Sequence, residues 1–197
     1  MIDEVISVLK DKLNDYVRFK TGHPEDKVVL PEGSKLDPSQ FQLNNITPML
    51  INIDEEKTAR LPDRFGGVIK NGLRTEFNPD IAVNLLVLFV VRFDDYRQSM
   101  KFLSLIIKFF QRTRIIDRSN TPSLSPEIDR LTIELQALPL ADQNELWMSL
   151  NSTYQPSLLY KVRMLVFKDT ESSEDVYEIT KTQINISIAG NGGKASI

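Results

Sequence analysis

The sequence predicts an α/β fold, in the α+β sense, with a mixed β-sheet flanked by helices. Residues 81–91 (IAVNLLVLFVV) are apolar at both strand parities except for Asn84, which is typical of a central strand covered on both faces. Residues 96–110 repeat apolar side chains at helical spacing. Strand and helix patterns therefore alternate, in the order helix, strand, strand, helix, strand, helix, strand, strand.

The first predicted elements are a helix and a long aperiodic segment. Residues 2–19 carry an apolar stripe at helical spacing and end at a Gly-then-Pro stop. Residues 21–45 contain three prolines and lack periodicity. Unstructured segments of this length are uncommon in compact domains. We expect either a mobile loop or an arm that becomes ordered on a partner.

The middle of the chain predicts strands on either side of a hairpin. Residues 46–58 form an apolar run that turns polar, and the Asn-Gly pair within residues 60–79 is a hairpin signal. After the central strand, Asp94 or Asp95 is the expected cap of the next helix.

The last third predicts a helix between strands. Residues 130–138 alternate apolar and polar side chains, as in a half-exposed strand. Asp142 and Glu145 have capping-box spacing at the start of a short helix. Strands are expected at 158–167 and 176–188, the second with a parity flip that indicates a bulge. We expect a single domain over 1–188 and a flexible tail at 189–197.

Composition excludes several functions. The net charge of −3 argues against a nucleic-acid partner, which requires a basic surface. The chain has no cysteine and one histidine, His23, so thiolate catalysis, Cys-ligated zinc and histidine clusters are impossible within it. No nucleotide-binding or hydrolase motif occurs. We therefore expect no cofactor, no metal and no enzymatic activity.

Segment lengths and the first residues of the chain indicate whether the protein enters a membrane or is secreted. The longest apolar run has about half of the ~20 residues that a membrane helix needs, so we expect no direct membrane insertion. The first residues (MIDEVISVLK) are acidic where a signal peptide would be basic. We expect folding in the cytoplasm.

Two groups of residues are candidate interfaces. Arg112, Arg114 and Arg118 follow the second helix and form either a solvated connection or a basic rim for an acidic partner. The last predicted strand, with Ile184, Ile186 and Ile188, can lie at a sheet edge and recruit another chain, or can pair internally with 158–167.

The single tryptophan, Trp147, has two interpretations. It can pack over the strand that contains Tyr160, Val162 and Met164, or it can anchor an interface, where tryptophan is enriched. Pro156 and Ser157 end the short helix and direct the following strand.

Three stretches resemble one known family. Residues 85–111 (LLVLFVVRFDDYRQSMKFLSLIIKFFQ) and 49–60 (MLINIDEEKTAR) are similar to two of its segments. Residues 130–167 look like its strongest signature, Leu-x-x-Leu-Trp followed by Pro-Ser-x-x-Tyr-Lys-Val-Arg; Gln143 stands at the first Leu position here, and the match includes Trp147, Pro156, Ser157 and Tyr160. The chain resembles the tail-terminator, or cap, proteins of phage-tail-like contractile injection systems, of the virulence-cassette and antifeeding-prophage kind.

The resemblance implies a structural protein with a tail-terminator-like fold. Such caps form a ring, usually hexameric, on the baseplate-distal end of the inner tube. They end tube growth and join the tube end to the last sheath ring. The expected partners are other copies of the chain, the inner tube protein and the sheath protein, in a released or membrane-anchored particle. The alternative is an adaptor of the same fold that anchors the particle to a baseplate or envelope component.

Overall fold

The computed structural model describes residues 1–31, 41–56, 68–70, 73–75, 81–167 and 176–177. The chain divides into two compact units, one within Met1–Pro62 and Asp80–Lys168, the other within Asp63–Pro79 and Asp169–Ile197. The single domain over 1–188 and the tail at 189–197 stay predictions.

The larger unit is built on a five-stranded sheet. The strands, in the order β1-β4-β7-β6-β5, are β1 (Asn45–Glu55), β4 (Ile81–Arg92), β7 (Ser157–Phe167), β6 (Arg130–Gln136) and β5 (Ile115–Asp117). All four pairings are antiparallel. Within the described ranges, the mixed pairing expected from the sequence is limited to one parallel bridge, between Val28 and Ile46. The predicted sheet with flanking helices is confirmed.

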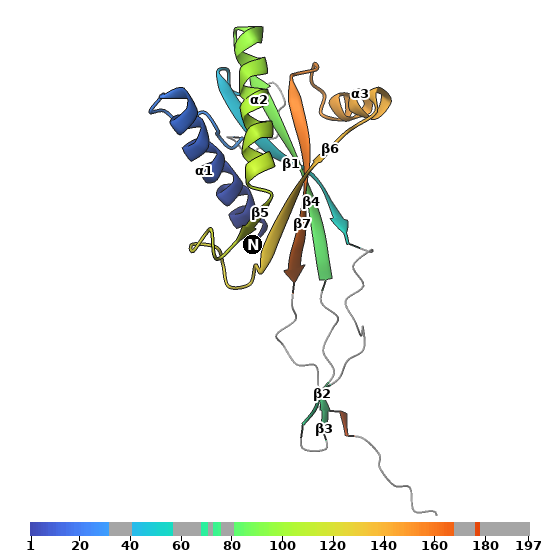
Figure 1. Ribbon diagram of the computed structural model, residues 1–197. Coiled ribbons are helices and arrows are strands. Elements are labelled where there is room, and N and C mark those ends of the chain that lie inside the picture. Colours follow the sequence, from blue (N-terminus) through green and yellow to red (C-terminus); the bar gives the residue numbers. More distant parts are fainter. Residues whose placement is uncertain (32–40, 57–67, 71–72, 76–80, 168–175, 178–197) are drawn as a thin grey trace, which may run out of the picture. The chain divides into compact units, whose positions relative to one another are not determined.

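Helices α1 (Ile2–Thr21) and α2 (Tyr96–Arg112) lie on one face of this sheet (Figure 1). The C-cap of α1, Gly22, has φ 71°, a left-handed conformation that glycine adopts without a steric penalty. The α2 helix begins after Asp95, whose side chain accepts a hydrogen bond from the Arg97 backbone N–H at 2.9 Å. Of the two predicted caps, Asp95 is the one that the structure uses.

The first core fills the space between these helices and the sheet. Odd-numbered β4 residues from Val83 to Val91 face it. The helices contribute Val5, Leu9, Leu13, Val17, Phe102, Ile106, Phe109 and Phe110. The α1 stripe buries its residues at the spacing of three or four that the sequence predicts.

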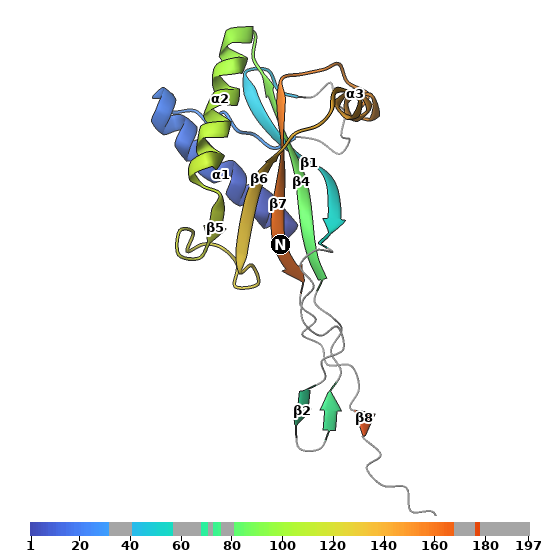
Figure 2. The ribbon, with the colours of Figure 1, turned by 45° about the vertical axis from the view of Figure 1, so that its right-hand side comes forward.

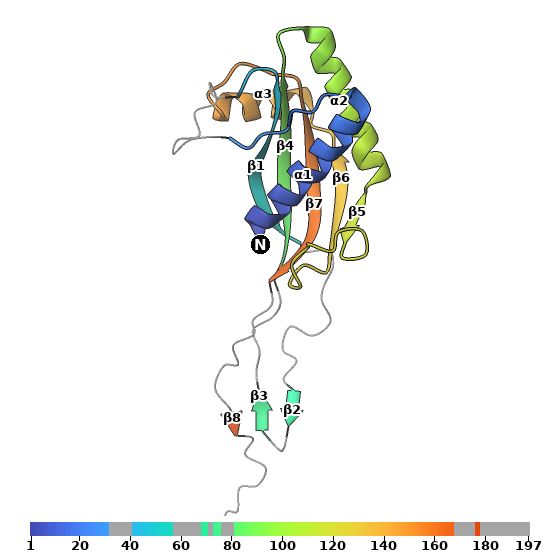
Figure 3. The ribbon, with the colours of Figure 1, turned by 90° about the vertical axis from the view of Figure 1, so that its left-hand side faces the viewer.

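Helix α3 (Leu140–Ser149) lies on the opposite face, toward β1 and β4 (Figures 2 and 3). A second, smaller core lies beneath it and includes the even-numbered β4 residues Leu88 and Val90. The helix does not begin at the predicted capping box. Pro139 is the N-cap, no side chain caps the helix, and Asp142 lies in its first turn. Because the helix begins at Leu140, Asp142 is its third residue, where the carboxylate interacts favourably with the helix dipole instead of serving as the N-cap.

The smaller unit contains β2 (Val68–Lys70), β3 (Leu73–Thr75) and β8 (Val176–Tyr177), in the order β2-β3-β8. Lys70 pairs with Leu73, so antiparallel strands flank the predicted Asn-Gly turn. Only the first two residues of the strand predicted at 176–188 belong to the described part of the chain. The sequence did not predict strand β5, because its three residues, within a Ser/Pro-rich connection, are too few to show an alternation of apolar and polar side chains.

Candidate protein–protein interfaces

Trp147 lies on the inner side of α3 and is 3 % exposed. Its neighbours in the second core are Phe41, Met49, Leu88, Val90 and Leu159. Trp147 thus packs over the strand that contains Tyr160 and Val162, and it does so through Leu159, whereas Tyr160 and Val162 themselves belong to the first core. Successive side chains of β7 point to opposite faces of the sheet, so Leu159 meets α3 while its neighbour Tyr160 faces α2.

The Pro-Ser segment sets the register of β7 against β4. The Pro156 carbonyl accepts a hydrogen bond from the Val91 N–H at 2.8 Å, and Ser157 pairs with Val90. Three residues further, the Tyr160 ring packs in the first core, 4.5 Å from the centroid of Phe110. Burial raises the pKa of the Tyr160 hydroxyl to about 12, because the phenolate would lose its hydration. The signature residues thus connect both cores through one strand.

The three candidate arginines lie on one side of the larger unit. Arg112 is in the last turn of α2, where a positive charge is favourable beside the helix C-terminus. Arg114 precedes β5, and its carbonyl accepts a hydrogen bond from the Ile133 N–H at 2.8 Å. Arg118 differs from them, because its guanidinium donates to the Pro126 carbonyl at 2.9 Å, within the connection between β5 and β6. Arg112 and Arg114 are exposed and make no side-chain hydrogen bond or ion pair with any described residue.

A hollow of about 660 Å³ opens between the C-terminal part of α2 and β6. Its floor contains the buried rings of Phe110 and Tyr160, and its rim includes Arg114. Three aliphatic side chains that remain well exposed line it: Ile107, Ile115 and Leu135. We call this surface, together with Arg112, the α2–β6 hollow.

Exposed apolar residues also lie on α3 and in the turn that follows it. Leu140 is 84 % exposed and Met148 is 71 % exposed, and Tyr154 follows in the next turn at 61 %. The acidic residues Asp142 and Glu145 are on the same helix and are exposed. We call these five residues the α3 surface.

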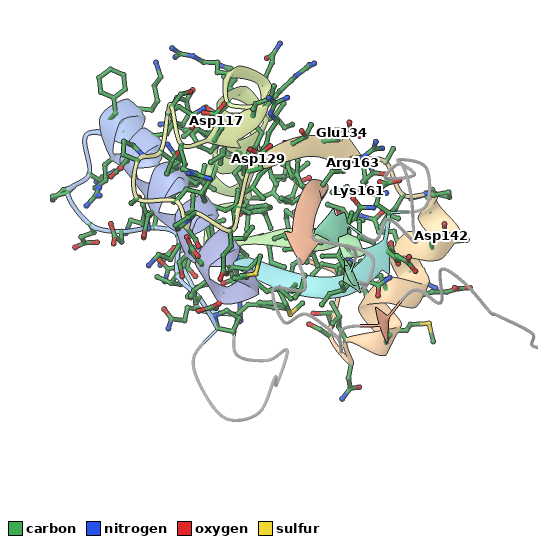
Figure 4. The ribbon with its side chains drawn as sticks, turned by 90° about the horizontal axis from the view of Figure 1, so that it is seen from below. Asp117, Asp129, Glu134, Asp142, Lys161 and Arg163 are labelled. Atoms are coloured by element: carbon green, nitrogen blue, oxygen red, sulfur yellow. The ribbon has the colours of Figure 1, made fainter. Side chains whose placement is uncertain are left out.

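The charged side chains that Figure 4 labels lie in separate groups. Glu134 and Arg163 form an ion pair at 3.1 Å, with Lys161 close by, while Asp142 stands apart on α3 (Figure 4). No group of three or more His, Asp or Glu side chains within the described ranges can hold a metal ion. No described helix is both long and apolar enough to span a bilayer.

Sequence reasoning placed some interface candidates and missed others. Ile184, Ile186 and Ile188 lie outside the described residues, so their edge-strand role stays a prediction. Neither the α2–β6 hollow nor the α3 surface was predicted. The available signal for the α3 surface was the presence of apolar residues on both sides of a ten-residue helix. The hollow had no such signal, because it depends on where α2 ends relative to β6.

The larger unit has the layered sheet fold of tube-terminating caps. The chain aligns with the tube-terminating cap of the anti-feeding prophage with a TM-score of 0.51 and 13% identity, over 89% of this chain and 59% of that one. It also matches the PVC sheath/tube terminator of an extracellular contractile injection system, in the extended state, with a TM-score of 0.49 and 13% identity. This match covers 91% of this chain and 63% of that one. The chain thus spans less than two thirds of either structure's length.

The chain belongs to the Pvc16 N-terminal domain family, whose model matches residues 4–178. This membership confirms the resemblance to the tail-terminator family of contractile injection systems that the sequence predicted. No curated protein matches the chain by sequence.

Proposed function

We propose that this protein is a structural terminator of a contractile injection system. The family match over residues 4–178 carries the proposal, because it includes both the sheet and the Trp–Pro-Ser–Tyr signature. The fold shared with the anti-feeding prophage cap supports it. A terminator acts by binding rather than by chemistry, which agrees with the exposed surfaces described above.

In the proposed assembly, copies of the chain form a ring, six in number, on the baseplate-distal end of the inner tube. The ring blocks further addition of tube subunits and holds the last sheath ring. Its partners are itself, the inner tube protein and the sheath protein, with no nucleic acid and no membrane insertion. Assembly takes place in the cytoplasm, before the particle is released or anchored.

The proposal is tested with purified inner tubes. Tubes are incubated with the purified chain, washed, and imaged by electron microscopy. We expect added density at one tube end and no elongation of that end when more tube subunits are supplied. Density at the baseplate end would favour the adaptor instead, and tubes that elongate normally at both ends would overturn the terminator role.

Deletion of the chain in a producing cell provides an independent check. We expect particles whose tubes vary in length and whose sheaths are not held at the distal end. Restoring the chain on a plasmid is the control. Particles of uniform length with attached sheaths, formed without this chain, would contradict the proposal.

A further inference from the structure

The α3 surface exposes three apolar residues, Leu140, Met148 and Tyr154, although α3 already buries Trp147. Leu140, Asn144 and Met148 are four residues apart and therefore share one side of the helix. Asn144 donates to the Met148 sulfur at 3.7 Å, so the polar residue of this row is turned toward its neighbour. Isolated exposed aliphatic residues are ordinary, but exposed ones repeated along one side of a helix indicate a contact site.

The α2–β6 hollow has the complementary shape and the same apolar character. Ile107, Ile115 and Leu135 are 40 %, 44 % and 50 % exposed around a hollow of about 660 Å³. Strand β5 pairs with β6 only from Arg130 to Thr132. Leu135 therefore lies on a part of β6 that β5 does not cover. A convex helix surface with long aliphatic side chains can fill such a hollow.

The charges of the two surfaces are opposite. Arg112 and Arg114 at the hollow are basic, whereas the charged residues of α3 are Asp142 and Glu145, both acidic. Arg112 and Arg114 at the hollow, and Asp142 and Glu145 on α3, all lack an ion pair among the described side chains. The acid at the hollow, Glu134, is paired with Arg163 at 3.1 Å. Complementary charge of this kind favours one partner and one orientation.

The two surfaces belong to opposite faces of the same sheet. Helix α2 packs in the first core and α3 in the second, and Figure 2 shows α3 toward the β1 side while β5 and β6 form the other edge. A contact between two different surfaces of identical chains is heterologous, and it generates a ring when the rotation closes.

We infer that neighbouring copies of this chain join head to tail, with the α3 surface of one copy seated in the α2–β6 hollow of the next. The inference rests on the proposed terminator function and specifies which faces meet in its ring. Leu140 and Met148 enter the hollow, and Asp142 and Glu145 lie against Arg112 and Arg114. The occupant of the hollow is a second copy of this chain.

Crosslinking tests the contact directly, because the chain has no native cysteine. Met148→Cys and Ile115→Cys are prepared separately and together, and treated with a short thiol–thiol crosslinker both free in solution and on tube ends. We expect each single variant to stay monomeric on a denaturing gel, their mixture to give a dimer, and the double variant to give a ladder. The matched control is Phe19→Cys with Ile115→Cys, since Phe19 is 79 % exposed on α1, outside both surfaces.

A crosslinked dimer from Met148→Cys alone would overturn the inference, because it would show a symmetric contact. So would tube ends that bear the chain but give no Met148–Ile115 crosslink. That second result would leave the terminator function intact. Absence of the chain from tube ends would instead count against the proposed function itself.

Charge reversal gives a second, independent readout. Arg114→Glu and Asp142→Arg should each weaken self-association by about tenfold or more, since each places like charges together. The double variant should regain most of the loss, because every contact then carries the reversed pair. Sedimentation measures association, and an unchanged melting temperature shows that each variant is folded. If the double variant loses as much self-association as the two single variants combined, the proposed charge pairing is contradicted.

Discussion

The rings of Phe41 and Trp147 meet edge to face, with centroids 6.1 Å apart and planes inclined by 73°. Phe41 precedes β1, whereas Trp147 is on α3, so this contact joins distant parts of the sequence. It encloses the second core on the side of the sheet that α1 and α2 leave open. The single tryptophan therefore holds α3 against the sheet.

Truncation of Trp147 should destabilise the protein strongly. Trp147→Ala removes a ring that is 3 % exposed, and we expect a loss of about 3–5 kcal/mol in the free energy of unfolding. Trp147→Phe retains much of the packing and should cost about 1–2 kcal/mol. Denaturant unfolding measures both values. A melting temperature unchanged by Trp147→Ala would show that the ring contributes no core packing.

The Phe41–Trp147 contact should appear as energetic coupling. In a double-mutant cycle with Phe41→Ala and Trp147→Ala, we expect about 0.5–1.5 kcal/mol of non-additivity. Phe19→Ala replaces Phe41→Ala in the control cycle, because the exposed Phe19 ring makes no contact with Trp147. Additive losses in the first cycle would mean that the two rings stabilise the fold independently.

The Asn14 side chain should contribute strongly to the free energy of unfolding, although it is polar. From within α1 it donates to the Val28 carbonyl at 2.8 Å and accepts from the Val28 and Lys27 N–H groups at 2.8 and 3.0 Å. Asn14→Ala leaves buried backbone groups without partners, so we expect a loss of about 2–4 kcal/mol.

Asn144→Ala is the matched control for Asn14→Ala and should change stability by less than about 0.5 kcal/mol, because Asn144 is exposed. Thermal and denaturant unfolding compare the two variants. Hydrogen exchange adds a local readout, since the Val29 N–H bonds to the Ile46 carbonyl at 2.9 Å and should lose protection when Asn14 is removed. Equal effects of the two substitutions would contradict the assigned role.

The two adjacent aspartates before α2 should contribute differently to the stability of the protein. Asp95→Ala removes the helix cap and should cost about 1 kcal/mol. Among the described residues, the Asp94 carboxylate accepts from the Asn44 side-chain amide at 3.4 Å, and the other bond to Asn44 comes from the Asp94 backbone N–H, which alanine keeps. Asp94→Ala should therefore cost less than about 0.5 kcal/mol. Chemical denaturation of the two variants under identical conditions measures the difference, and the reverse order would show that the cap is misassigned.

Tyr160 should make stability fall at high pH. Its pKa is raised to about 12 in the folded state from 10, so both states keep the neutral phenol below pH 10. Between pH 10 and 12 only the unfolded chain ionises, which lowers the free energy of unfolding by about 2–3 kcal/mol. Tyr160→Phe removes this contribution. The free energy of unfolding of the wild type minus that of the variant should therefore fall across that window, whereas a constant value would contradict the shift.

Local patterns in the sequence determined most of the elements. The stripe of α1, the doubly apolar run of β4 and the alternation of β6 each reflect contacts whose spacing is set by backbone geometry alone. The Gly22 stop and the Asp95 cap are equally local, because one residue's conformation or one side-chain bond decides them. The family signature around Trp147 was also readable, because it is a contiguous string of residues.

Only the tertiary structure decided which surfaces face each other and which face water. The sequence could not assign Trp147 to Leu159 rather than Tyr160, because that choice depends on which face of the sheet α3 covers. It could not reveal the α2–β6 hollow, which arises where a short β5 leaves part of β6 uncovered. Both features depend on the three-dimensional placement of elements far apart in the chain, and no local periodicity records that placement.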